Sequence, residues 1–150
     1  MAFSVRKATL EDLDKLVYFT IAEAVEAEGV QLVPDVVMKG IRQALEQPEI
    51  SQYWVLESSK SGVVGSVSVM KEWSAWQGGF FWWLQTMFIV PEYRGQNLPK
   101  LLIEHVRDLA RRDFALELRM YFHKDNTRAI KAYNRQGFEE SPYHIRIMRL

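Results

Sequence analysis

The sequence predicts a single α/β (α+β) domain over residues 1–150, with a mixed, mostly antiparallel sheet of six to seven strands and about four flanking helices. Three strand-like runs separated by turn residues indicate an antiparallel meander in the middle of the chain. The hydrophobic period then changes to that of a helix at Asn97. Two successive strand–helix units follow, which add a parallel part to the sheet.

The first part of the chain predicts one strand and two helices. The strand is expected at residues 3–8. Thr9 and Asp12 resemble a capping box at the start of a helix over residues 10–28, which carries a broad apolar stripe. A second helix is expected over residues 34–48, because a proline suits its first turn and another proline closes it.

Three strands are expected next, over residues 53–58, 63–69 and 80–90. The second is rich in valine, a β-branched residue that favours strands. The glycines in Lys60-Ser61-Gly62 and Gly78-Gly79 supply the two turns. These turns make the three strands an antiparallel meander.

The last third of the chain alternates helices with strands. After Asn97, apolar side chains recur at the spacing of one helix face, at Leu98, Leu101, Leu102, Val106, Leu109 and Ala110. A strand over residues 115–122 and a helix over residues 125–136 follow, because apolar and polar side chains first alternate and Gly137 then stops a helix. Residues 143–150 alternate again and predict a last strand.

Composition excludes several classes of protein and site. With 19 basic and 19 acidic residues the formal net charge is zero, which argues against a nucleic-acid partner. The chain has no cysteine, which excludes disulfides, thiolate metal sites and cysteine nucleophiles, and no metal site is expected. No signal peptide or membrane span is recognised, so we expect a cytoplasmic protein without a membrane partner.

The turn that joins the third meander strand to the long helix predicts a phosphate site. Gly95 and Asn97 tolerate positive φ, and Pro99 suits the first turn of a helix. Free N–H groups at a helix N-terminus, with Arg94 and Lys100 beside them, favour an anion. An ordinary strand–turn–helix corner is the alternative.

A second candidate segment begins at Asn126, directly after a strand. Asn126 and Tyr133 are seven residues apart, or two helical turns, so both project from the same side of a helix. Asn126 is suited to hydrogen-bond a ligand amide, and the alternative is that it only caps the N-terminus of the helix. Tyr133 suits a site residue, or a half-buried core aromatic.

The run Val90-Pro91-Glu92-Tyr93-Arg94-Gly95 and the run from Asn126 to Phe138 together resemble the GCN5-related N-acetyltransferase (GNAT) superfamily, in particular its uncharacterised bacterial members. The resemblance spans nearly the whole chain and implies a GNAT-like fold whose sheet splays between the fourth and fifth strands. It also implies an acyltransferase that moves an acetyl group from acetyl-CoA to a primary amine of a small molecule or protein, by direct attack in a ternary complex.

The same resemblance implies the site residues. Tyr133 would be the general acid that protonates the leaving thiolate. The residues implied in cofactor binding are Met87, Phe88, Ile89, Arg94, Gly95, Gln96, Asn97, Leu98, Pro99, Lys100, Asn126 and Tyr133. Arg94 matches the first position of the family's Arg/Gln-x-x-Gly-x-Gly/Ala pattern. Asn97 and Pro99 occupy its two small positions, so we expect pyrophosphate binding to survive with reduced affinity.

The general base is left open by the sequence. Gln85 stands where relatives often have a carboxylate, and an amide cannot accept the proton. Glu72, Glu92 and His123 are the candidates, each with a solvated surface role as the alternative. Gln85 also supports a second function, a catalytically weak acyl-CoA-binding module.

The block from Trp73 to Trp83 is rich in tryptophan and phenylalanine. Neighbours on a strand face opposite sides, so one of Trp82 and Trp83 points away from the core. The block suits a homodimer surface, the wall of an acceptor pocket, or cross-strand packing within the sheet.

Overall fold

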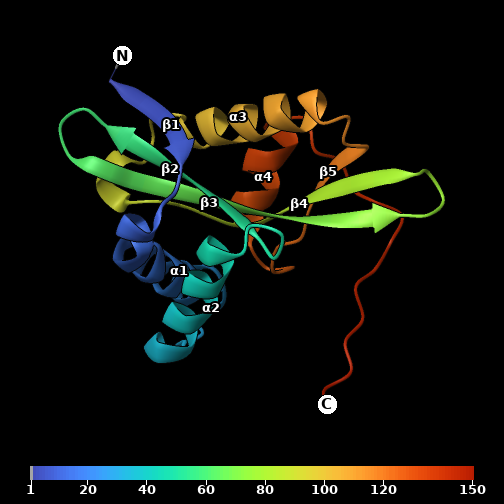
Figure 1. The fold of residues 1–150 in the computed structure, drawn as a ribbon, viewed down its shortest axis with the longest axis horizontal. Coiled ribbons are helices and arrows are strands. Elements are labelled where there is room, and N and C mark those ends of the chain that lie inside the picture. The colour runs from blue at the N-terminus through green and yellow to red at the C-terminus, as the bar shows by residue number, and fades with distance from the viewer. Residues whose placement is uncertain (1) are drawn as a thin grey trace.

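Figure 1 shows the computed structural model, which describes residues 2–150. The elements are, in order, β1 (Phe3–Lys7), α1 (Leu13–Glu28), α2 (Pro34–Glu46), β2 (Gln52–Ser58), β3 (Gly62–Ser74), β4 (Gly79–Ile89), α3 (Leu98–Arg112), β5 (Glu117–Met120) and α4 (Thr127–Arg135). Short 3-10 turns at Leu10–Asp12 and Pro91–Tyr93 precede α1 and α3. None of the helices in this described part is long and apolar enough to cross a membrane.

The strands form one sheet in the order β1-β2-β3-β4-β5. Strands β1 to β4 run antiparallel to their neighbours, and β5 runs parallel to β4. One face, which includes Trp54 and Leu56, packs against α3 and α4, and the other, which includes Val55, packs against α1 and α2 (Figure 1). A mixed sheet between two helix layers confirms the expected α/β (α+β) fold class.

The last strand expected over residues 143–150 is not formed, and the sheet of the described chain has five strands rather than six or seven. Strand β5 is also shorter than the expected residues 115–122. Residues 141–150 are exposed and lead away from the sheet (Figure 1). Alternation predicts an extended backbone, but a strand also needs a neighbour that supplies hydrogen bonds, and this segment pairs with none of the described strands.

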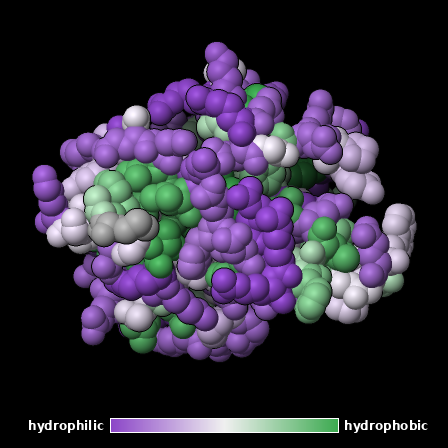
Figure 2. Space-filling view, turned by 90° about the horizontal axis from the view of Figure 1, so that it is seen from above, coloured by the Kyte–Doolittle hydropathy of each residue, from purple (hydrophilic) through white to green (hydrophobic). Residues whose placement is uncertain are grey.

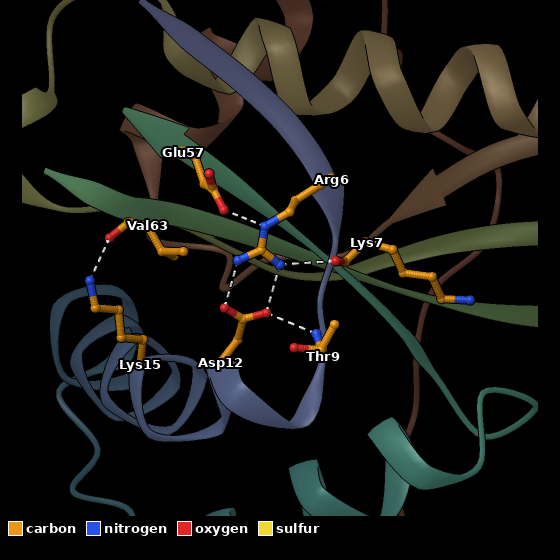
Figure 3. Close-up of polar contacts among 7 residues, drawn as sticks. All are labelled: Arg6, Lys7, Thr9, Asp12, Lys15, Glu57 and Val63. Atoms are coloured by element: carbon orange, nitrogen blue, oxygen red, sulfur yellow. Dashed lines mark hydrogen bonds and ion pairs between the residues drawn. The ribbon is translucent and has the colours of Figure 1, made fainter. Parts of the chain in front are cut away.

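A buried carboxylate ties β1 to the start of α1 (Figure 3). The Thr9 N–H donates to Oδ2 of Asp12 at 2.8 Å, within the expected capping box. The Arg6 guanidinium donates two bonds to the same carboxylate, at 2.8 and 2.9 Å, and a third to Glu57 on β2. The bonds from Arg6 hold the pKa of Asp12 below its usual value, although burial opposes them.

Asp12→Asn is expected to lower the free energy of unfolding by about 2–3 kcal/mol, because it removes the charge of the buried carboxylate that accepts two of the three Arg6 bonds and leaves Glu57 as the remaining acidic partner of Arg6. Since the folded pKa of Asp12 is lowered, its contribution is complete above the unfolded pKa of ~3.9 and is lost as the pH falls through the folded value. Urea unfolding at pH 7 and at pH 3 measures both effects.

The matched control for this variant is Asp14→Asn, which alters an exposed carboxylate two residues away. It should leave the free energy of unfolding within ~0.5 kcal/mol of the wild type. An equal loss of stability in the two variants would contradict the role assigned to Asp12.

Candidate functional site

Strands β4 and β5 separate along part of their length. They pair at four positions, from Phe81 opposite Glu117 to Leu84 opposite Met120. Beyond Leu84, β4 continues to Ile89, and among the described strands only β3 remains beside it. The expected splay between the fourth and fifth strands is therefore confirmed. It leaves the main chain of residues 85–89 open on one side.

A β-bulge bends β4 where this separation begins. Val67 of β3 lies opposite Met87 and Val69 lies opposite Leu84, so β4 has one extra residue between these pairs. The buried Ser68 accepts the N–H of Thr86 at 3.1 Å, and the two hydroxyl oxygens are 2.7 Å apart. This bulge was not expected from the sequence, where a serine within a run of valines was the available signal.

The turn between β4 and α3 leaves backbone N–H groups without helical partners. Its φ angles are positive at Gly95 (83°) and Asn97 (59°), as those residue types allow. Pro99 lies in the first turn of α3, where its missing N–H costs no hydrogen bond. The first N–H groups of a helix have no intrahelical acceptor, so this corner can hold an anion.

The two cations predicted for the phosphate site both contact acidic side chains of the chain itself. Nη2 of Arg94 donates to the Glu26 carboxylate of α1 at 2.8 and 3.1 Å. Nε of Arg94 donates to the Ile89 carbonyl at 2.8 Å, at the end of the open stretch of β4. Nζ of Lys100 lies 3.7 Å from Glu104. An incoming anion must therefore compete with Glu26 for Arg94.

Asn126 and Tyr133 both take the structural roles that the sequence left as alternatives. Oδ1 of Asn126 accepts the Ala129 N–H at 3.2 Å and caps α4. This bond uses Oδ1 and not Nδ2, so the amide donor can serve a ligand carbonyl. The half-buried ring of Tyr133 packs 5.9 Å from the ring of Phe122 and 6.0 Å from that of Phe138. These roles fix the two side chains and leave their ligand roles as predictions.

The charge of one glutamate on α1 acts on Tyr133, which is distant from it in the sequence. Burial, and to a lesser extent the charge of Glu23, raise the pKa of Tyr133 to about 12. Burial, followed by the charges of Glu28 and Glu26, raises the pKa of Glu23 to about 7. Glu23 lies on α1 and was missed by the sequence analysis. A cluster of glutamates on one short stretch of an otherwise apolar helix was the available signal.

Two of the three residues first considered as bases are held by local contacts. Glu72 accepts the Trp83 Nε1–H at 2.9 Å. Nδ1 of His123 accepts the Asp125 N–H at 3.2 Å. Gln85 and Glu92 are exposed. Within residues 2–150, no cluster of three or more metal-ligating side chains is found.

The aromatic block divides between the core and the surface. Trp82 is buried and Trp83 lies on the opposite face of the sheet, as strand alternation required. Trp73 pairs directly with Phe80 across the β3–β4 hairpin, with ring centroids 5.0 Å apart. Trp76, in the hairpin turn, is 93% exposed. Cross-strand packing therefore explains part of the block, and an exposed aromatic surface remains.

Comparison with solved structures places this geometry among acetyltransferases. A possible acetyltransferase from Clostridium difficile 630 is 27% identical, with a TM-score of 0.93 over 100% of this chain and 99% of that chain. A predicted acetyltransferase from Clostridium acetobutylicum, solved with acetyl-CoA, is 14% identical, with a TM-score of 0.80 over 97% and 96%. The aminoglycoside N-acetyltransferase AAC(6')-Iy, solved with CoA, is 15% identical, with a TM-score of 0.80 over 98% and 94%.

Comparison with family models gives the same assignment. Residues 49–140 match the acetyltransferase (GNAT) domain, which covers more than half of the chain. A search of curated proteins finds no match. The splayed β4–β5 pair and the turn before α3 lie within the matched residues. The chain therefore belongs to the GNAT family of acetyltransferases, as its resemblance to that superfamily implied.

Proposed function

We propose that the chain is an acetyl-CoA-dependent N-acetyltransferase that acetylates a primary amine of a small molecule or a protein within a ternary complex. The observation that carries the proposal is the open main chain of residues 85–89, which leads directly into the turn before α3, where free N–H groups are available to an anion. The two relatives solved with CoA or acetyl-CoA share this fold and support the same donor.

The residues present fit acetyl-CoA. The main chain of residues 87–89 would pair with the amides of the pantetheine arm, as an added strand pairs with a sheet edge. The free N–H groups between Gly95 and Leu98 would hold the pyrophosphate, with Arg94 and Lys100 beside it. Nδ2 of Asn126 would donate to a pantetheine carbonyl. When bound, acetyl-CoA supplies the acetyl thioester.

Tyr133 suits the general acid because its proton stays in place at physiological pH. With a pKa of about 12, the phenol is protonated at neutral pH. Donating this proton to a thiolate of pKa ~8.5 costs about 5 kcal/mol, more than the ~2 kcal/mol of an unperturbed tyrosine. Both costs are small beside enzymatic barriers, so the acid role remains feasible.

Glu23 suits the general base that Gln85 does not supply. An alkyl ammonium of pKa ~10.4 must lose a proton before it attacks, at a cost of roughly 4–5 kcal/mol at pH 7. A carboxylate with a pKa of about 7 is a stronger base than an ordinary glutamate and is still half ionised at neutral pH. Because the charge of Glu23 also acts on Tyr133, the proposed acid, we propose Glu23 as the acceptor of the amine's proton.

Calorimetric titration with acetyl-CoA, followed by thiol release with a library of amines, tests the proposed function. Acetyl-CoA should bind, and at least one primary amine should release CoA at a rate that depends on enzyme concentration. Binding without turnover on any amine would instead favour the acyl-CoA-binding module. Absence of binding would overturn both.

The ion pair between Arg94 and Glu26 makes a paired prediction for the pyrophosphate site. Glu26→Gln is expected to tighten acetyl-CoA binding about three-fold, because it removes a competitor for the guanidinium. Arg94→Gln is expected to weaken it about ten-fold. The Kd from calorimetry measures both, and Glu28→Gln, an exposed carboxylate on the same helix, is the control. Equal weakening by the two variants would show that Arg94 acts only by joining β4 to α1.

A further inference from the structure

The side chain of Tyr93 joins the turn before α3 to a turn from a distant part of the chain. Tyr93 ends the 3-10 turn that follows the open stretch of β4 and precedes the free N–H groups at the start of α3. Its phenolic oxygen lies 2.5 Å from Oγ of Ser61 and 3.2 Å from Oγ of Ser58. Both serines belong to the β2–β3 turn, residues 58–62, at the left-hand end of the molecule in Figure 1. Hydrogen bonds between side chains therefore join two turns that are 32 to 35 positions apart in the sequence.

The β2–β3 turn is itself held by hydrogen bonds, so it can serve as an anchor. Ser58 and Gly62 are paired across the antiparallel β2–β3 ladder and close the turn. The N–H of Ser59 donates to the carbonyl of Ala2 at 2.9 Å, which ties the turn to the start of the chain. The N–H of Lys60 donates to Oγ of Ser58 at 3.1 Å, and this serine is buried. The position of Ser58 is therefore fixed independently of Tyr93.

The ring of Tyr93 is held separately from its hydroxyl group. It packs against the core cluster between the sheet and α3, as does Phe3 of β1. The two rings meet edge to face, with centroids 5.8 Å apart. Hydrophobic side chains, green in Figure 2, gather at the same left-hand end of the molecule. Tyr93→Phe should therefore keep the packing of the ring and remove only its hydrogen bonds to the β2–β3 turn.

Arg94, the next residue, also ties this turn to other parts of the fold, but its contact is of a different kind. Its guanidinium donates to the Glu26 carboxylate of α1 and to the Ile89 carbonyl. An incoming anion competes with Glu26 for this guanidinium, so the tie to α1 is weakened when the anion binds. The bonds of Tyr93 join neutral hydroxyl groups and involve no such competition. Tyr93 can therefore hold the turn both before and after an anion binds.

We propose that Tyr93 is a positioning residue for the pyrophosphate of acetyl-CoA, because its hydroxyl, held by Ser58 and Ser61, fixes the turn whose N–H groups receive the anion. These N–H groups lie between Gly95 and Leu98. Donors that are already in place lose less conformational freedom when a ligand binds, which raises the affinity. Tyr93 therefore acts on binding of the donor and not on the transfer step. This inference rests on the proposed function, since it concerns the same acetyl-CoA site.

Calorimetric titration with acetyl-CoA tests the role of the hydroxyl in binding. Tyr93→Phe is expected to raise the Kd about five-fold, the effect of losing one neutral hydrogen bond. Ser61→Ala should cause part of this loss, because Ser58 still contacts the phenol. The double variant should bind as Tyr93→Phe does, since both changes remove the same contact. Ser59→Ala, an exposed serine of the same turn, is the matched control and should bind as the wild type does. An unchanged Kd in Tyr93→Phe would overturn the proposal.

A donor without a pyrophosphate separates positioning of the turn from a general effect on the fold. With acetyl-CoA, Tyr93→Phe is expected to raise the KM about five-fold and to keep kcat within about two-fold of the wild type. With S-acetylpantetheine, which carries the same thioester and no pyrophosphate, the variant and the wild type should have equal kcat/KM. An equal loss with both donors would show that the hydroxyl supports the whole site and would overturn the proposal.

Nitrogen-15 relaxation of the ligand-free protein tests the same role without any donor. The order parameters of Gly95, Gln96 and Asn97 are expected to fall in Tyr93→Phe, from the ~0.85 of a rigid backbone toward the ~0.6 of a flexible one. They should be unchanged in Ser59→Ala. Absence of acetyl-CoA binding by the wild type would overturn the proposed function. Unchanged order parameters in Tyr93→Phe, with acetyl-CoA still bound by the wild type, would overturn the positioning role alone.

Discussion

Tyr133→Phe is expected to lower kcat for acetyl transfer about 100-fold, with less than about a three-fold change in the KM for acetyl-CoA. The substitution removes the phenolic proton and keeps the ring, so the contacts with Phe122 and Phe138 remain. Loss of an interaction made in the transition state lowers kcat and leaves ground-state binding nearly unchanged. Thiol release under saturating amine measures the effect.

The pH dependence of the wild-type rate provides a second test of the acid role of Tyr133. Because the pKa of Tyr133 is raised to about 12, its acid form persists through the accessible alkaline range. The wild-type rate should therefore show no fall from loss of this proton below pH 10. Tyr121→Phe, which removes an exposed phenol near the end of β5, is the matched control and should retain the wild-type rate. Equal rates for Tyr133→Phe and the wild type would remove Tyr133 from the acid role.

Features with a local cause were predictable from the sequence. Gly95, Asn97 and Pro99 restrict or release the backbone at their own positions, so the shape of the turn before α3 follows from neighbouring residues. The Thr9–Asp12 capping box is local for the same reason. The splay between β4 and β5 was predicted from the family resemblance and not from any single residue.

Features that depend on distant contacts were not predictable in this way. The pKa of Glu23 depends on burial of α1 and on its neighbours, and the influence of Glu23 on Tyr133 depends on how α1 and α4 lie in the fold. The bulge at Ser68 depends on the register of β3 against β4. For residues 143–150 the alternation predicts an extended backbone, but it carries no information about whether another strand lies beside it.

Glu23→Gln is expected to lower kcat/KM for the amine about 100-fold at pH 7, because the amide keeps the shape of the side chain and cannot accept the amine's proton. A general base cannot accept the amine's proton once it is itself protonated. Because the pKa of Glu23 is raised, the enzyme should lose activity as the pH falls below about 7. The wild-type rate should therefore rise with pH through the pKa of Glu23, about 7, and then level off. This rise should be absent from Glu23→Gln, and its persistence there would exclude Glu23 as the base.

Glu28→Gln separates a base at Glu23 from a general effect of acidic charge on α1. The negative charge of Glu28 helps to raise the pKa of Glu23, so its removal favours ionisation of Glu23 at lower pH. Glu28→Gln should retain the plateau rate and shift the rising limb to lower pH. A loss of plateau rate equal to that of Glu23→Gln would mean that α1 acts through its summed charge and not through one proton acceptor. If the rising limb shifts to lower pH while the plateau rate is unchanged, the group that titrates is one whose pKa responds to the charge of Glu28, as the pKa of Glu23 does. The burial that also raises the pKa of Glu23 is unchanged in this variant.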